Sequence, residues 1–386
     1  MTQKPLRVGI DLTAIWRQPT GIFRYSTEIA RHLLQMQEQE ADIPIRYFLF
    51  FARNIHPDFL PFRGTFDAVI CPFTNELFIK QFWFPLILPR LDLDVMHYPA
   101  FPPPYFQPFA AYSTIMTLHD AGPWRYPQTL TLRGRLYFRA LLARGMHTCT
   151  RVITVSNHAK AEIGVFLGER FLPKIAVIPE AAHSRFAFPC SDDLKASVRA
   201  SYHLPERYFL TVATVEPRKN LVTLLAGYRL LSKRLGTKCP PLVIVGRRGW
   251  QYSTILQYVT ELENKVIFPG FVIDEVLVAL YQMATCLVFP SLYEGFGLPV
   301  LEAMTAGCPV ITSNLSSLLE VAGDAALLVD PLQALEIAVA MQQVLQDDTL
   351  RPLMILAGRN QAARFSWTQT ARMTRDIYLQ AADRST

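Results

Sequence analysis

Short apolar runs rich in β-branched and aromatic residues alternate with helix-patterned segments along the whole of this sequence. This alternation predicts parallel sheets whose strands are joined by crossover helices, which is the α/β class of fold. The chain has 386 residues, enough for two domains of ordinary size. Because 51% of the residues are apolar and 18% are charged, the chain can bury a large core, which excludes a disordered protein.

The two halves of the chain repeat the same pattern. Strands are expected at Leu6–Asp11, Arg46–Phe51, Ala68–Cys71, Val95–His97, Ser113–Leu118, Val152–Val155, Ile175–Pro179, Tyr208–Thr214, Leu242–Gly246, Val266–Phe268, Cys286–Pro290, Pro309–Thr312 and Ala326–Val329. Helices are expected at Gly21–Gln37, Leu221–Leu235, Gln251–Glu263, Glu275–Met283, Leu298–Thr305, Gln333–Gln346, Leu350–Phe365 and Thr368–Ala382. A polar stretch near Cys190–Asp193 separates the halves. We therefore predict two doubly wound domains, 1–190 and 191–365, facing each other across a ligand cleft.

The cysteines and the charges limit the partners of the chain. Its six cysteines form no CxxC pair and no Cys/His cluster, so neither a disulfide framework nor a zinc site is indicated. Residues 1–190 hold 20 of the 38 Lys and Arg and 14 of the 32 Asp and Glu, so the whole net charge of +6 lies there. The basic residues are scattered, which disfavours nucleic acid as a partner. An acidic membrane face remains as the anionic partner.

No apolar stretch approaches the ~20 residues of a membrane span, and no signal-peptide core follows the N-terminus. A cytoplasmic protein is expected. The basic N-terminal half and the aromatic segment Phe78–Leu88 leave peripheral contact with the inner face of a membrane open, although a segment of this kind is more often part of a core.

Two features of the first half point to a ligand site. Gly21 follows a predicted strand and opens a helix, where free N–H groups attract anions and a glycine lets a phosphate approach the backbone. A glycine that only makes a turn is the alternative. His119 stands at the carboxyl end of another strand, where it could hydrogen-bond a sugar hydroxyl or assist proton movement. A histidine satisfied within the core is the alternative there.

The second half carries two further features. Arg218 and Lys219 follow a buried strand and suit a diphosphate, the first as a bidentate fork and the second as a point charge. Glu294 and Glu302, eight residues apart, can accept hydrogen bonds from vicinal hydroxyls of a hexose and a ribose. Backbone N–H groups of Gly295, Phe296, Gly297 and Leu298 would meet phosphate at the helix start. Ordinary surface charges are the alternative at both places.

Taken together, these segments resemble the glycosyltransferase family 4 enzymes, which have the GT-B fold of two Rossmann-like domains. The resemblance follows an ordered series over nearly the whole chain: PTGIFRY (19–25), LHD (118–120), ITVSNHAK (153–160), EPRKN (216–220), IVGRRGW (244–250), VIFPGFVIDEVL (266–277) and SLYEGFGLPVLEAMTAGCPVITS (291–313). The last block is the most specific. By this resemblance the N-terminal domain lies on the acceptor side, the C-terminal domain binds the nucleotide sugar, and a final helix within 366–386 crosses back to the N-terminal domain.

The resemblance also implies roles for single residues. Arg218 and Lys219 would hold the donor diphosphate and stabilise the leaving group. Glu294 would bind the 3- and 4-hydroxyls of the sugar, and Glu302 the ribose. His119 would lie near the 6-position of the sugar or at the reaction centre. The remaining donor-binding positions are Gly21 against the diphosphate, and Gly246, Arg247 and Ile267 beside the base.

The implied function is a retaining, metal-independent and cofactor-free transferase, similar to bacterial polysaccharide mannosyltransferases. It would move a hexose, best mannose from GDP-mannose, to a saccharide or lipid-linked acceptor in cell-surface polysaccharide synthesis. A nucleotide-sugar 2-epimerase and a non-catalytic sugar-nucleotide-binding partner protein are the alternatives. The sequence departs from the family pattern at Trp16 and Arg17, which precede Gly21, and at 180–183, where relatives often have a glycine-aspartate turn.

Overall fold

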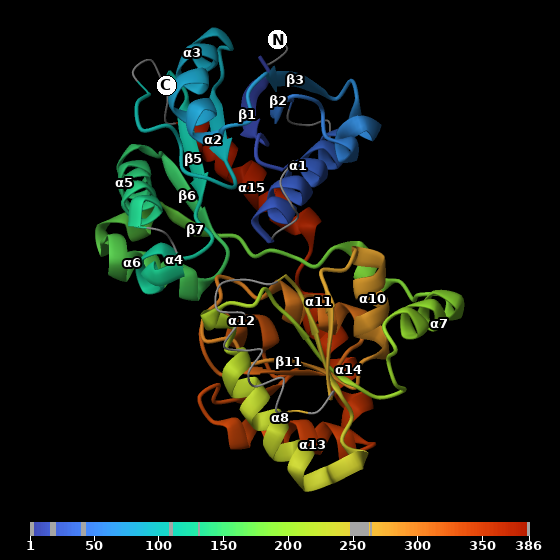
Figure 1. Cartoon of the computed structure of the whole chain (residues 1–386). Helices are drawn as coiled ribbons and strands as arrows, with labels where there is room; N and C mark the ends of the chain where they lie inside the picture. The colour runs from blue at the N-terminus through green and yellow to red at the C-terminus, as the bar shows by residue number, and fades with distance from the viewer. Residues whose placement is uncertain are drawn as a thin grey trace. The chain divides into compact units, whose positions relative to one another are not determined.

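The computed structural model describes residues 4–15, 21–39, 44–107, 111–129, 132–247, 262 and 265–383. Contacts within the chain divide it into two compact units (Figure 1). The first unit comprises Met1–Glu180 and Ser366–Thr386, and the second comprises Ala181–Phe365.

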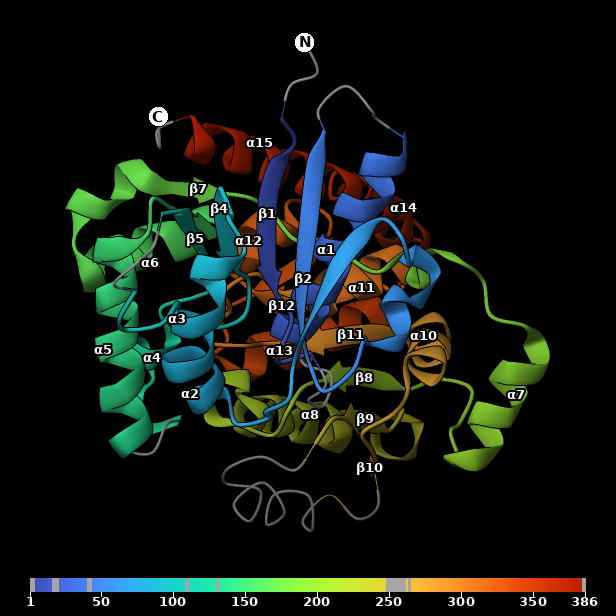
Figure 2. The same ribbon diagram turned by 90° about the horizontal axis from the view of Figure 1, so that it is seen from above.

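The first unit is built on a parallel sheet in the order β3-β2-β1-β4-β5-β6-β7 (Figures 1 and 2). Its strands are β1 Leu6–Asp11, β2 Ile45–Ala52, β3 Phe66–Cys71, β4 Val95–Tyr98, β5 Ser113–Thr117, β6 Arg151–Thr154 and β7 Ile175–Val177. Its helices are α1 Gly21–Gln39, α2 Glu76–Phe78, the π-helical turn η2 Ile79–Trp83, α3 Phe84–Ile87, α4 Gly122–Arg125, α5 Leu132–Thr148, α6 Asn157–Leu167 and α15 Trp367–Ala382.

Alternation along β4 shows which helices cover which face of this sheet. Successive side chains of a strand point to opposite faces. Met96 and Tyr98 join the cluster of buried residues under α3, whereas His97 hydrogen-bonds Tyr378 of α15 at 2.7 Å. The terminal helix therefore packs on the face opposite to α3, beside α1.

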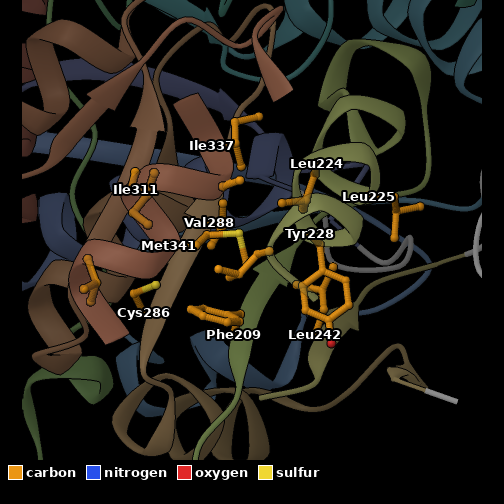
Figure 3. Close-up of a cluster of buried hydrophobic side chains, with 14 of the residues drawn as sticks. Phe209, Leu224, Leu225, Tyr228, Leu242, Cys286, Val288, Ile311, Ile337 and Met341 are labelled. Atoms are coloured by element: carbon orange, nitrogen blue, oxygen red, sulfur yellow. The ribbon is translucent and has the colours of Figure 1, made fainter. Parts of the chain in front are cut away.

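The second unit is built on a parallel sheet in the order β10-β9-β8-β11-β12-β13. Its strands are β8 Phe209–Val212, β9 Leu242–Val245, β10 Val266–Gly270, β11 Cys286–Phe289, β12 Val310–Ser313 and β13 Leu327–Val329. Its helices are α7 Asp192–Ser201, α8 Leu221–Leu235, α10 Asp274–Met283, α11 Leu298–Ala306, α12 Leu318–Ala322, α13 Ala334–Gln346 and α14 Leu350–Ala362. In Figure 3, side chains of α8 and α13 such as Tyr228 and Met341 pack onto Phe209 and Val288 of the central strands.

The expected α/β architecture with two parallel sheets is confirmed, and the strand ends differ from the expected ones by a few residues. Helices α5, α6 and α7 were not predicted, and neither were the shorter helices α2, α3, α4 and α12. The helix expected at 251–263 lies, apart from Leu262, outside the described residues.

The boundary between the units comes earlier than the predicted position near residue 190. Residues 181–190 belong to the second unit because they pack on α10. Arg185 Nη1 lies 3.0 Å from Asp274 Oδ2, and the Cys190 amide donates to Gln282 Oε1 at 2.9 Å. The polar stretch that suggested a linker instead contains the N-cap of α7, the side chain of Ser191.

Candidate active site

A strained turn places the two cations of the second unit. After β8 the chain enters a 3₁₀ turn at Pro217–Lys219, and Asn220 adopts a left-handed conformation with φ of 57° before α8 begins. The Asn220 amide group donates to the carbonyl oxygens of Pro290 and Pro331 at 3.1 and 2.6 Å. Asparagine is one of the few residues that tolerate this conformation. The turn therefore holds Arg218 and Lys219 at the carboxyl end of the sheet.

The loop after β11 meets this turn because β8 and β11 are neighbouring parallel strands. The carbonyl oxygen of Arg218 accepts hydrogen bonds from the Leu292 amide at 2.8 Å and from the Ser291 hydroxyl at 3.0 Å. These contacts bring residues more than 70 positions apart together, and Glu294 follows directly in the same loop.

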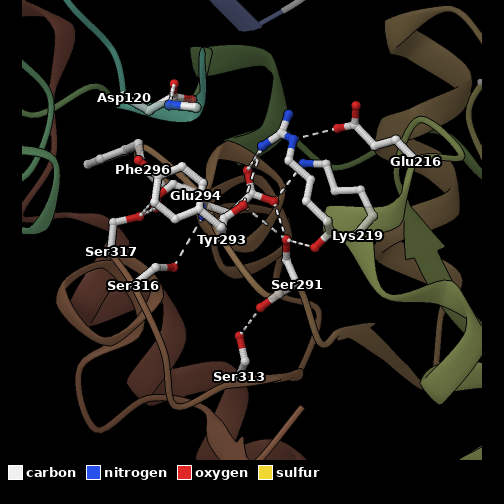
Figure 4. Close-up of polar contacts among 12 residues, drawn as sticks. Asp120, Glu216, Lys219, Ser291, Tyr293, Glu294, Phe296, Ser313, Ser316 and Ser317 are labelled. Carbon is white, nitrogen blue, oxygen red and sulfur yellow. Dashed lines mark hydrogen bonds and ion pairs between the residues drawn. The ribbon is translucent and has the colours of Figure 1, made fainter. Parts of the chain in front are cut away.

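Glu294 lies between the two cations (Figure 4). Its Oε1 accepts hydrogen bonds from Lys219 Nζ at 2.6 Å and from Ser291 Oγ at 2.7 Å, and its Oε2 accepts one from Arg218 Nη1 at 3.2 Å. On its other side Arg218 pairs with Glu216, with 2.6 Å between Nε and Oε1. Glu294 is 6% exposed and Lys219 is 9% exposed, so this is a buried and nearly neutral cluster of charges.

The charges of Glu294 and Lys219 each shift the pKa of the other residue. Burial raises the pKa of Glu294, but the charges of Lys219 and Arg218 and the hydrogen bond of Ser291 outweigh it and leave that pKa below its usual value. Burial and the neighbouring Arg218 charge lower the pKa of Lys219 against the opposing effect of Glu294. The Glu294 side chain is therefore an ionised acceptor at neutral pH, suited to hydroxyl groups and poorly suited to act as an acid.

The segment Gly295–Leu298 leads from this carboxylate into α11. The Ser317 hydroxyl lies 2.9 Å from the carbonyl oxygen of Glu294 and 2.7 Å from that of Phe296, which fixes the loop. Gly297 has φ of 120°, and a Cβ atom there would lie 2.7 Å from Leu318. The first N–H groups of a helix have no partner within it, so the start of α11 can bind an anion.

Glu302 lies farther along α11 and makes a different contact. Its Oε2 accepts a hydrogen bond from the Tyr281 hydroxyl at 3.2 Å, and the side chain is buried. Its contact with Tyr281 of α10 is separate from the hydrogen bonds that join Arg218, Lys219 and Glu294.

Of the three residues predicted beside the base, Gly246 and Arg247 lie at the carboxyl end of β9, and Ile267 lies nearer the other end of the sheet. Gly246 follows β9, and its amide donates to the carbonyl oxygen of Gly270 at 2.9 Å. The Arg247 guanidinium lies over the exposed Phe271 ring at 4.6 Å. Ile267 lies within β10, where it pairs with Val243 of β9. Arg247 and Phe271 therefore present a cation and an aromatic ring beyond the carboxyl ends of β9 and β10.

His119 belongs to the first unit, and both of its ring nitrogens are engaged. Nδ1 lies 3.1 Å from Glu180 Oε1, and Nε2 lies 2.9 Å from the carbonyl oxygen of Pro99. Both partners are acceptors, so both nitrogens must donate, which requires the imidazolium form. In this arrangement His119 is a fixed cation rather than a proton acceptor.

Burial lowers the pKa of His119, but the Glu180 carboxylate, the Pro99 carbonyl and the charge of Asp120 together raise it above its ordinary value. The nearby His97 behaves oppositely, because burial and the charge of His119 lower its pKa to about 3. His119 is therefore the cationic histidine of the two, and His97 is neutral. Neutral His97 joins Tyr378 and Thr117 in a buried hydrogen-bond network.

Replacing Glu180 with glutamine is expected to lower the unfolding free energy by about 1 kcal/mol at pH 6, because the amide oxygen still accepts the Nδ1 hydrogen bond but carries no charge, and a hydrogen bond between a charged pair is stronger by about that amount. The pKa of His119 is higher in the folded state than in the unfolded state. The ion pair therefore makes its full contribution to the unfolding free energy below about pH 6.5, and this contribution is lost as the pH rises through the folded-state pKa. The difference between wild type and Glu180→Gln should therefore shrink in alkaline solution. Urea unfolding at several pH values measures it. A difference that grows with pH would contradict the ion pair.

Gly21 opens α1, is exposed, and lies in the first unit. Trp16 and Arg17, which precede it, lie outside the described residues. Among the residues that the structure describes, no group of three or more His, Cys, Asp or Glu is placed to hold a metal ion, and metal independence stays a prediction. None of the described helices combines the length and the apolar character needed to cross a bilayer.

Three residues of these clusters were not singled out as ligands or partners from the sequence. Glu216 precedes Arg218 by two positions, a spacing that could have indicated their ion pair. Ser291 is the first residue of the glycine-rich block, but nothing in the sequence around it indicated its hydrogen bond to Glu294. Glu180 reaches His119 across 61 residues, and no local signal predicts such a contact.

The chain is similar to known glycosyltransferases. Residues 197–361 match the family described as glycosyl transferases group 1. The O-antigen chain mannosyltransferase B of Escherichia coli is 34% identical over 279 residues, which cover 72% of each chain. The O-antigen chain mannosyltransferase RfbU of Salmonella typhimurium is 32% identical over 56% of each chain.

Among solved structures, the sucrose-phosphate synthase of Thermosynechococcus elongatus matches with a TM-score of 0.74 and 21% identity, covering 97% of this chain and 98% of that one. The lipopolysaccharide glycosyltransferase WaaG matches with a TM-score of 0.70 and 17% identity, covering 96% and 99%. At these identities the likeness shows the fold alone, and that fold is GT-B.

Proposed function

The chain belongs to the group 1 glycosyl transferases, and we propose that it transfers mannose from GDP-mannose, with retention of configuration and without a metal ion, during synthesis of a cell-surface polysaccharide. That the protein is a glycosyltransferase follows from its family. The donor, the sugar and the acceptor are the content of the proposal. Mannose is favoured because the relatives in Escherichia coli and Salmonella typhimurium are named O-antigen chain mannosyltransferases.

The observation that carries the donor assignment is the buried cluster of Arg218, Lys219 and Glu294. Breaking the bond between sugar and phosphate builds negative charge on the departing diphosphate. Fixed cations in a site with little water stabilise such charge without reorganisation. Arg218 and Lys219 supply two cations within hydrogen-bond distance of one carboxylate, and Glu294 offers that carboxylate to the sugar hydroxyls.

A covalent glycosyl-enzyme intermediate is the established route to retention in glycosidases, and it needs a free carboxylate beside the anomeric carbon. Glu294 is a poor candidate, because two cations and Ser291 already engage its oxygens. We favour attack of the acceptor on the same face from which the diphosphate departs, with the departing phosphate accepting the proton of the acceptor hydroxyl.

The acceptor is proposed to be a saccharide or a lipid-linked saccharide, and the enzyme to work in the cytoplasm in peripheral contact with the inner face of the membrane. The charge of the chain supports this part, because the net charge of +6 lies entirely within residues 1–190. Basic surfaces are attracted to the anionic lipids of that membrane face.

A thermal-shift panel tests the donor assignment. GDP at 100 times its dissociation constant should stabilise the protein by roughly 2.7 kcal/mol, a shift of a few degrees, and EDTA should not change it. UDP, ADP and NAD serve as comparisons. Stabilisation by UDP alone would mean that the donor carries uracil instead of guanine. A rise in unfolding temperature that EDTA abolishes would contradict metal independence. If no nucleoside diphosphate stabilises the protein, the diphosphate site is wrong. Release of free nucleotide without acceptor would favour the 2-epimerase.

A further inference from the structure

Exposed aromatic side chains gather on one region of the first unit. Of the eight exposed Phe and Tyr residues in the described part of the chain, six belong to it, together with four exposed leucines. We call these ten residues the aromatic surface: Phe73, Leu77, Phe78, Phe82, Leu86, Tyr105, Phe106, Leu132, Leu136 and Tyr137. Single exposed apolar residues are ordinary in proteins, whereas a gathered set marks an interaction site.

One helical ridge forms the first part of this surface. Phe78, Phe82 and Leu86 are four residues apart along α2, η2 and α3, so they line one side of the ridge. The rings of Phe78 and Phe82 stack at 5.3 Å, and Phe73 meets Phe78 at 4.6 Å. These aromatic rings are therefore a continuous apolar strip.

Contacts at Gln81 join this ridge to the rest of the surface. The Tyr105 amide donates to Gln81 Oε1 at 2.9 Å, and the Tyr137 side chain of α5 interacts with the same glutamine. The Arg144 guanidinium of α5 lies over the Tyr105 ring at 5.7 Å. Figures 1 and 2 both draw α2 and α3 beside α5. The ridge, the loop at Tyr105 and α5 thus form one surface.

The underside of the ridge is anchored, so the exposed rings sit on a rigid base. Ile79 and Phe84 are fully buried in the core cluster beneath the ridge. Lys80, also buried, forms an ion pair with Asp11 at the end of β1. A protein that exposes aromatic rings on a fixed base loses little conformational freedom when they contact a partner.

The charges near the rings are mostly positive, although Glu76 at the start of α2 is an acidic residue that acts on Tyr137. Helix α5 contains four arginines and neither aspartate nor glutamate. Arg135, Arg139 and Arg144 donate to the carbonyl oxygens of Pro127, Pro123 and Tyr105, bonds that do not neutralise their charge. The stretch from Leu77 to Leu91 also lacks acidic residues. This combination of exposed aromatic rings and uncompensated arginines matches an anionic lipid headgroup layer.

We propose that the aromatic surface docks on an anionic lipid bilayer, with its rings at the boundary between headgroups and acyl chains and the arginines of α5 on lipid phosphates. The purpose of this docking rests on the proposed function, because a lipid-linked acceptor is presented at a membrane. The docking itself needs neither donor nor acceptor.

Vesicle flotation tests the inference. The wild-type chain is expected to bind vesicles of phosphatidylglycerol and phosphatidylcholine, to bind pure phosphatidylcholine far more weakly, and to lose binding as salt rises. The variant Phe82→Asp with Leu86→Asp should bind the anionic vesicles at least about tenfold more weakly. The matched control, Leu353→Asp with Leu356→Asp on α14, changes a leucine pair of comparable exposure (63% and 61%, against 59% and 67%) and should bind as wild type does.

Two results would overturn the inference: wild-type protein that does not float with the anionic vesicles, and equal loss of binding in both double variants. A wild-type chain that instead elutes as a dimer dissociated by Phe82→Asp would assign the surface to a second copy. Thermal shift by GDP, measured on the same variants without vesicles, reports on the donor site alone. If the protein binds vesicles but no nucleotide raises its unfolding temperature, the proposed function is contradicted and this inference is still supported.

Discussion

Replacing Lys219 with alanine is expected to lower kcat for sugar transfer by at least about 10²-fold, because the departing diphosphate loses a cation placed within hydrogen-bond reach. The measurement is transfer from the nucleotide sugar under saturating donor. Lys233→Ala, which removes an exposed lysine from the last turn of α8, serves as the control and should leave transfer unchanged. Near-normal turnover of Lys219→Ala would remove Lys219 from the site.

The structure adds a cost in stability to this prediction. Lys219 lies 2.6 Å from Glu294 in a buried cluster, and removing one partner of a buried ion pair leaves the other charge uncompensated. Such changes destabilise proteins by about 3–5 kcal/mol. Arg218 and Ser291 still contact Glu294, so we expect the lower end of that range.

A double variant separates the two effects. Lys219→Met with Glu294→Gln removes both charges and should recover most of the unfolding free energy lost in Lys219→Ala, while transfer stays absent. The single variant Glu294→Gln should keep GDP binding, because the cations remain and a repelling carboxylate is gone, yet lose transfer with the sugar contact. If the double variant recovered transfer, the loss in Lys219→Ala would be one of folding alone.

The sequence predicted the strands well because buried parallel strands produce a strong local signal. Leu6–Asp11 is a short apolar run whose bounds agree with β1, and Cys286–Phe289 lies one residue inside its expected bounds. Helices with a weak apolar stripe were missed. Helix α7 buries Val198 alone among its ten residues, so a polar composition concealed it even though Ser191 caps it. In α5 two glycines and four arginines interrupt the apolar spacing.

The candidate site likewise has a part that the sequence predicted and a part that it did not. Arg218, Lys219 and Glu294 each lie at a predicted strand end, so the sequence places them at one edge of a sheet. That they touch depends on β8 lying next to β11, which is a property of strand order and has no local signal. The ion pair of His119 with Glu180 has the same origin, since it joins the ends of different strands.

Gly246→Ala should be the most destabilising single substitution among the predicted site residues. Gly246 has φ of 148°, and a Cβ atom there would lie 2.0 Å from the carbonyl oxygen of Ala213. That oxygen belongs to the backbone, so relief requires β8 and β9 to separate at their carboxyl ends. A strained conformation and overpacking each cost about 1–3 kcal/mol, so we expect a loss of about 3–5 kcal/mol.

Gly236→Ala provides the matched control for this substitution. Gly236 also has a positive φ, 58°, but no atom lies within 4 Å of the position of its added Cβ. Its cost should be the conformational one alone, about 1–3 kcal/mol. Urea unfolding of both variants measures the difference. Equal costs would mean that β9 can move away from Ala213 freely. In that case the carboxyl end of this sheet is not the rigid platform that a nucleotide site requires, and the assignment of Gly246 and Arg247 to the base would lose its structural support.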